Sequence, residues 1–245
     1  MGVSGARGAV WMDAFVLCPA LAVLVAASTV SGSAQSLPDN PQPHAESFLS
    51  SIHDPPNYTR PSEQTLFRVY TFDLVGPYPL FISASTAGLH QAQNSPSLWG
   101  QGFDGYMRRF GSSFGIGAVE TTTRYALAET IHEDTLYYEC ACKGFGPRLR
   151  HAVISSFTGR RGSDGRRVIS FPSIVAPYAG TFTAACAWYP KSYGLGDAIR
   201  MGSYGLLGYM GGNIGLEFIY GGPHSLLAKA HIPIPTNAAP QGQNP

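Results

Sequence analysis

The sequence has few charged side chains, and this scarcity limits what the protein can be. Asp, Glu, Lys and Arg make up 13% of its residues, about half of the ~25% that is usual for a soluble domain. The formal net charge is +1, so no excess of one sign would attract nucleic acid or an acidic partner. Few charges beside many glycines and aromatics favour helices that pack closely together or that contact lipid.

Metal-binding patterns are also scarce. The sequence lacks the His-Glu-x-x-His motif that places two zinc ligands and a general base on one helix. Cys140 and Cys142 form a pair that resembles part of a metal site, but no fourth ligand is evident. We therefore expect no metal and no cofactor. Together with Cys186 the pair makes an odd number, and a disulfide from Cys186 to either Cys140 or Cys142 is an alternative.

The N-terminal region has the pattern of a secretory signal peptide. Arg7 precedes an apolar run from Ala14 to Ala27, and small residues follow as far as Ala34. The run is shorter than the ~20 residues that a transmembrane anchor needs, so an anchor is the weaker alternative. We expect cleavage after Ala34, and a protein that is exported to the periplasm or outer envelope.

The remaining chain divides by composition into three parts. Residues 35–65 are rich in proline and polar residues and read as a disordered leader. Residues 66–231 read as a single helical domain, and residues 232–245 as a disordered tail rich in Pro, Asn and Gln. The predicted fold class is mainly α, a compact bundle of about four to five glycine-rich helices after the signal peptide and the leader.

Within the domain, periodicity and helix-breaking residues predict the elements. We expect a short strand or extended segment over 66–75, a short buried helix over 80–93 and a helix from Ser95-Pro96 to about Tyr138. A helix from Gly146-Pro147 to Gly159 and a polar loop over 160–167 should follow. The last elements are a charge-free stretch over 171–189, which opens at Ser170 and Pro172, and a helix from Gly194 to Tyr220. The first long helix carries an aromatic stripe, formed by Trp99, Phe103, Tyr106, Phe110 and Phe114.

The last predicted helix is unusually rich in glycine. Its glycines include Gly202, Gly205, Gly208 and Gly212, and Glu217 is the one charge between Met201 and Ile219. Small residues at such spacings let two helices approach closely, as they do in membranes. We therefore expect contact with a membrane or a membrane protein, and homo-oligomerisation through these four glycines is a further alternative. The same pattern also occurs in closely packed soluble bundles.

Three motifs in the chain resemble those of an uncharacterised family of exported bacterial proteins. They are Trp99-Gly-Gln-Gly-Phe-Asp-Gly-Tyr-Met-Arg-Arg-Phe-Gly111, the segment Leu127 to Tyr138 with His132-Glu133-Asp134, and Ala187-Trp-Tyr-Pro190. Thr135 and Leu136 stand where that family usually has proline and arginine. The resemblance covers roughly residues 66–220. It implies a mostly helical domain and supplies no activity.

The strongest candidates for chemistry are Glu129, His132, Glu133 and Asp134. On a helix, residues three or four apart share a face, so Glu129 would lie beside His132 and Glu133. Such a group could perform acid–base catalysis if it lay in a cleft. The alternative is a polar helix end whose side chains cap or bridge neighbouring helices.

Charge is also distributed unevenly along the middle of the chain. Acids predominate over residues 119–139, and a basic stretch that includes Arg160, Arg161, Arg166 and Arg167 follows. These four arginines are candidate binding residues for anionic lipid headgroups. Alternatively, the acidic and basic stretches pair with each other.

These observations predict an exported, membrane-associated envelope protein with a structural or binding role, without nucleic acid as a partner. The alternative function is an exported hydrolase that uses His132 with Glu133 or Asp134.

Overall fold

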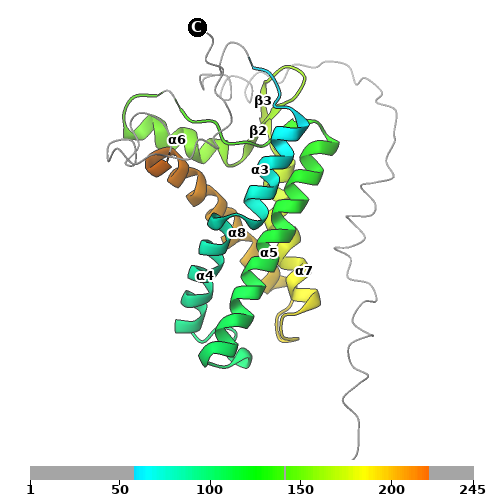
Figure 1. Cartoon of the computed structure of the whole chain (residues 1–245), viewed down its shortest axis with the longest axis vertical. Coiled ribbons are helices and arrows are strands. Elements are labelled where there is room, and N and C mark those ends of the chain that lie inside the picture. The colour runs from blue at the N-terminus through cyan, green and yellow to red at the C-terminus, as the bar shows by residue number, and fades with distance from the viewer. Residues whose placement is uncertain (1–57, 141, 221–245) are drawn as a thin grey trace, which may run out of the picture.

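The computed structural model describes residues 58–140 and 142–220 (Figure 1). In chain order the elements are α3 (Glu63–Val75), α4 (Pro77–Ala92), the 3-10 helix η2 (Ser97–Trp99), α5 (Gly102–Thr130), β1 (Glu133–Asp134), α6 (Phe145–Ser155), β2 (Thr158–Arg161), β3 (Arg167–Ile169), α7 (Phe171–Ala187), α8 (Leu195–Gly215) and the π-helix η3 (Leu216–Tyr220). The predicted mainly helical fold is confirmed. The predicted signal peptide, the tail and most of the predicted leader lie outside the described residues.

Helix α5 is the longest element, and the other long helices assemble around it. Helices α4 and α7 pack on α5, while α8 packs on α7 and α3 lies against the C-terminal half of α5 (Figure 1). Close approach of α5 and α7 depends on Gly180, since a Cβ there would stand 2.7 Å from the backbone oxygen of Ile116. Likewise, a Cβ at Gly202 of α8 would stand 2.5 Å from the Tyr178 ring of α7.

A small antiparallel sheet, which we did not predict, lies at one end of the helices. Its strand order is β1-β2-β3, and residues Glu133 and Asp134 pair with Arg161 and Arg160. The turn between β2 and β3 contains Gly165, which adopts a positive φ of 69°. The predicted polar loop over 160–167 is thus a β-hairpin.

Three further predictions of local structure are wrong. The segment 66–75 is part of helix α3, whose first turn is capped by the Ser62 hydroxyl accepting from the Thr65 amide at 3.3 Å. The long helix ends at Thr130 rather than near Tyr138, because His132 takes a positive φ of 52° and the chain then enters β1. The helix predicted to end at Gly159 ends at Ser155.

The start of α7 agrees with prediction. The Ser170 hydroxyl accepts from the Ser173 amide at 3.2 Å, and Pro172 occupies the first turn. At this position proline stabilises a helix because its missing N–H has no intrahelical acceptor.

Helix α4 exists as predicted, but it is not buried. Its buried residues are Ser83 and Ala87, while the Phe81 and Leu89 side chains are 69% and 62% exposed. None of the described helices is both long enough and apolar enough to cross a membrane.

Candidate functional site

The sheet joins the acidic segment to the basic hairpin around Asp134. This carboxylate is buried and accepts from the Tyr58 hydroxyl at 2.8 Å, the Tyr138 hydroxyl at 2.5 Å and the Leu136 amide at 2.9 Å. The Arg160 guanidinium lies 5.0 Å from the Tyr138 ring centroid and 5.5 Å from that of Tyr58. Burial and the Asp134 carboxylate both raise the pKa of the two tyrosines, so the hydroxyls stay protonated and donate.

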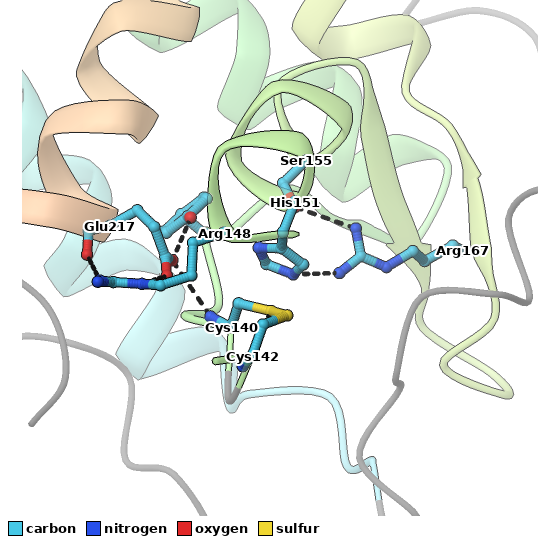
Figure 2. Close-up of a disulfide and its surroundings, with 8 residues drawn as sticks. Cys140, Cys142, Arg148, His151, Ser155, Arg167 and Glu217 are labelled. Atoms are coloured by element: carbon cyan, nitrogen blue, oxygen red, sulfur yellow. Dashed lines mark hydrogen bonds and ion pairs between the residues drawn. A yellow bond between two sulfur atoms is a disulfide. The ribbon is translucent and has the colours of Figure 1, made fainter. Parts of the chain in front are cut away.

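A second buried carboxylate, Glu217, lies where η3 meets α6 (Figure 2). It accepts from the Arg148 Nε at 2.8 Å, the Tyr137 hydroxyl at 2.6 Å and the Cys140 amide at 3.1 Å. Arg148 also donates to the backbone oxygen of Glu217 and lies 4.6 Å from the Phe218 ring centroid. A buried charge costs several kcal/mol unless it is paired and hydrogen-bonded, and here both conditions are met.

Figure 2 shows a disulfide beside this ion pair, formed by Cys140 and Cys142. Their Cα atoms are 5.0 Å apart, and the two cysteines are half-buried. The two alternatives that joined Cys186 to one of them are therefore wrong. On the other side of the disulfide in this view, the buried His151 ring accepts from Arg167 at 2.9 Å and meets the Tyr137 ring edge-on.

The four residues predicted for catalysis do not form one group. Glu129 pairs with Arg60 at 3.0 Å, and His132 is exposed in the turn after α5. Glu133 is buried in β1, where burial raises the pKa of its carboxyl, opposed by a hydrogen bond with Ser170. The expected common helix face does not exist because α5 ends before His132.

The four candidate arginines of the hairpin differ in how exposed they are. Arg160 is buried, and Arg167 is half-buried near Ser155 and His151. Arg161 and Arg166 are 56% and 76% exposed and form long ion pairs with Asp164. Only Arg161 and Arg166 therefore present their charge on the surface.

The glycines of α8 likewise serve different contacts. Gly202 and Gly205 face Tyr178 and Pro177 of α7 in the same chain, and a Cβ added at Gly212 would stand 3.2 Å from the Tyr78 hydroxyl of α4. Gly208 has no described atom within 4 Å of an added Cβ. Among the described residues, Gly208 therefore makes no close helix contact within a single chain.

The first sequence motif forms a turn that the buried Arg109 holds. Its guanidinium donates to the backbone oxygens of Ser95 at 2.8 Å, Pro96 at 2.9 Å and Gly100 at 2.8 Å, and to the side chain of Gln91 at 2.6 Å. Gly105 has no room for a Cβ against the Gly100 carbonyl. The motif is thus explained by folding and needs no ligand.

The residues that follow this motif match the sequence of a catalytic pattern but not its structure. Residues 111–115, Gly-Ser-Ser-Phe-Gly, match the nucleophile elbow Gly-x-Ser-x-Gly. They lie inside α5, whereas an elbow needs a sharp strand-to-helix turn that exposes the serine. The serine at the elbow position is Ser113, and its neighbour Ser112 accepts from the Trp188 indole at 2.8 Å.

Two shallow surface hollows lie away from the predicted catalytic residues. The first has a volume of about 440 Å³ and is lined by Phe67, Arg68, Thr71, Phe72, Val75 and Gly76 of α3 and its end. The second, of about 420 Å³, is lined by Trp99, Arg108, Gly111, Ser112, Gly115 and Trp188. Within the described ranges, no group of three His, Cys, Asp or Glu side chains is placed to hold a metal ion.

Sequence reasoning missed the residues that organise the polar clusters, namely Arg109, Arg148, His151 and Glu217. Glu217 did carry a signal, since it is a single charge in an otherwise uncharged run. Such a charge is expected to find a buried partner. Its partner could not be named, because Arg148 lies 69 residues away in sequence.

Comparison of the chain with protein-family models, curated proteins and solved structures finds no match. The resemblance to an uncharacterised exported family stays a prediction.

Proposed function

We propose that this is an exported envelope protein without catalytic activity, which associates with a membrane through an apolar surface on α3, α4 and the start of α5. We define the apolar surface by its most exposed large side chains, Phe67, Val75, Phe81, Leu89, Leu98 and Phe103, which are 56–76% exposed. Its role is structural or one of binding.

The observation that carries the proposal is that several charged side chains are buried while many large apolar side chains are exposed. The buried apolar side chains in the described part are Leu66, three prolines and six alanines, while the largest fully buried side chains are Arg109, Glu217 and Asp134. Large phenylalanines and leucines lie outside. A chain that left these side chains in water would forgo about 1.5–3 kcal/mol for each one that it could have buried completely.

The apolar surface is also continuous in sequence. From Leu74 to Phe103 the chain contains no Asp, Glu, Lys or Arg. An α4 in water would normally carry charges on its outer side, as amphipathic surface helices do. Exposed apolar areas of this kind mark contact with a membrane or a protein.

Charge on the outside favours a membrane with anionic lipids over a neutral partner. Among the described residues, eight Lys and Arg side chains are exposed, against four Asp and Glu. Arg68 lines the hollow on α3 beside Phe67 and Phe72, so a cation and apolar rings occur together. Each basic residue near an anionic surface contributes about 1 kcal/mol to binding.

The alternative, a hydrolase that uses His132 with Glu133 or Asp134, gains little from the geometry. His132 is exposed, Asp134 already accepts three hydrogen bonds, and neither hollow adjoins these residues. A general acid or base must be able to exchange a proton with a substrate that lies within hydrogen-bonding distance. We therefore favour the membrane-associated role.

Vesicle flotation tests the proposal. The purified chain is mixed with vesicles of phosphatidylglycerol or of phosphatidylcholine and separated on a density gradient. We expect it to float with the anionic vesicles, and Phe81→Asp to reduce the floating fraction strongly while circular dichroism stays unchanged. Ile169→Asp is the matched control, because Ile169 is 67% exposed but lies on β3, away from α4 (Figure 1).

Two outcomes would count against membrane association. One is a chain that stays monomeric and wholly soluble without detergent and does not float. The other is a Phe81→Asp chain that floats as well as the Ile169→Asp control.

A further inference from the structure

The Cys140–Cys142 disulfide lies where a reaction partner could reach it. Both cysteines are half-buried, and they belong to the irregular segment between β1 and α6, in which neighbouring Lys143 is exposed. A disulfide that reacts with external thiols needs access of this kind.

Stability does not explain this disulfide. A bridge stabilises a fold mainly by restricting the unfolded chain, and the effect grows with the length of the loop that it closes. Cys140 and Cys142 are two residues apart, so the loop is about as short as it can be. The segment is also held without it, because Glu217 binds both the Cys140 amide and the Tyr137 hydroxyl.

The two sulfur atoms differ in their hydrogen bonding. The Cys142 amide donates to the Cys140 Sγ at 3.3 Å. A hydrogen bond of this kind strengthens when its acceptor becomes an anion, so it favours a thiolate on Cys140. The nearest buried carboxylate, Glu217, has its charge balanced by Arg148 at 2.8 Å.

We propose that Cys140 and Cys142 form a reversible redox centre that exchanges with a dithiol. The dithiol's thiolate attacks Cys140 Sγ, the bond between the two Sγ atoms breaks, and Cys142 leaves as a thiolate. The second thiol of the dithiol then displaces Cys140 as a thiolate from the mixed disulfide. Two electrons and two protons pass to the protein, and the dithiol is oxidised to a disulfide.

Reversal of the same steps assigns the roles in the reduced protein. Cys140 is the nucleophile that attacks an oxidised partner, and Cys142 resolves the mixed disulfide. The centre is independent of the proposed membrane contact, since none of the residues that define the apolar surface takes part.

Native reduction followed by alkylation tests the centre. The full chain is treated with millimolar dithiothreitol without denaturant, alkylated and digested with trypsin. Residues 125–143 form one tryptic peptide that holds Cys140 and Cys142 and no other cysteine. We expect both to be alkylated while circular dichroism is unchanged, and neither to be alkylated after reoxidation by an oxidised dithiol. A bridge that opens only when denaturant unfolds the chain is structural and overturns the proposal.

Single variants test the assignment of the two sulfurs. In Cys142→Ser the remaining Cys140 thiol should react with glutathione disulfide faster than the Cys142 thiol of Cys140→Ser. At neutral pH the reaction rate of the more acidic thiol should be about three- to fourfold higher for each pKa unit between the two thiols. A lower pKa raises the thiolate fraction but makes the thiolate a weaker nucleophile. Equal rates, or a faster Cys142, would overturn the assigned order of attack.

Discussion

The polar end of the molecule and its apolar surface differ in where their partners come from. The polar end comprises β1, β2, residues 135–140 and 142–144, α6 and η3, and there the chain supplies the partners itself: Glu217 is bound by Arg148 and Tyr137, and Asp134 by Tyr58 and Tyr138. On the apolar surface, Phe81 and Leu89 are left without cover within the described chain. The first region pairs Glu217 and Asp134 within the chain, and we propose that lipid covers the second.

The largest effect should follow from breaking the polar end. Glu217→Ala removes the carboxylate from Arg148, the Tyr137 hydroxyl and the Cys140 amide together, and leaves a guanidinium that is only 11% exposed. We expect a loss of about 3–5 kcal/mol in the free energy of unfolding, measured by urea denaturation.

The matched control for that change is an acid whose ion pairs are exposed. Asp164→Ala removes contacts of 3.7 and 3.8 Å to Arg161 and Arg166, and it should cost at most about 1 kcal/mol. Equal losses from the two variants would mean that the Glu217 pairing contributes no more than a surface ion pair.

A smaller loss should follow from separating the helices that carry both regions. Gly180→Ala places a methyl group against the Ile116 carbonyl, so α7 must move away from α5, and we expect a loss of about 1–3 kcal/mol. Gly117→Ala, on the same helix pair but with no atom near its added Cβ, should stabilise α5 by up to about 1 kcal/mol. Thermal denaturation measures the change in stability of both variants, and we expect opposite signs. A Gly180→Ala variant that is more stable than the parent would contradict the close packing of α5 and α7.

Glu133 is an exception within the polar end, and its effect should depend on pH. Its Oε1 has no hydrogen-bond partner among the described residues, and burial raises the pKa of the carboxyl above its ordinary value of 4.5. The folded chain thus holds a proton that the unfolded chain releases, and this contribution to stability is lost as the pH rises from 4.5 through the raised pKa.

Glu133→Gln keeps the shape of the side chain but does not titrate. Its stability relative to the parent should therefore increase as the pH rises above 4.5, with Gly159 close beside the side chain in both proteins. Urea denaturation at several pH values measures the difference. A difference that does not change with pH would show that Glu133 has an ordinary pKa.

The sequence predicted helices where local rules decide, and failed where distant contacts decide. Ser170 and Pro172 marked the start of α7, and the stretch from Met201 to Ile219, in which Glu217 is the one charge, indicated α8. The segment 66–75 was expected to be a short strand or an extended segment, whereas the Ser62 cap and the stacking of Tyr70 on Tyr125 at 4.6 Å make it a helix.

The candidate site was harder to predict than the fold. His132, Glu133 and Asp134 adjoin in sequence, but the positive φ of His132 turns the chain and sends the buried acids into a sheet. The acidic and basic stretches lie side by side in β1 and β2 through backbone pairing. The partners of Glu217 lie 69 and 80 residues away, and no local pattern encodes that contact.

The central claim, that the apolar surface is covered by a membrane, is tested most directly by an environment-sensitive fluorescent amino acid in place of Phe81. On addition of phosphatidylglycerol vesicles we predict a blue shift of its emission, and none for the same amino acid in place of Ile169. Emission at position 81 that stays at its value in water when the vesicles are added would contradict the account.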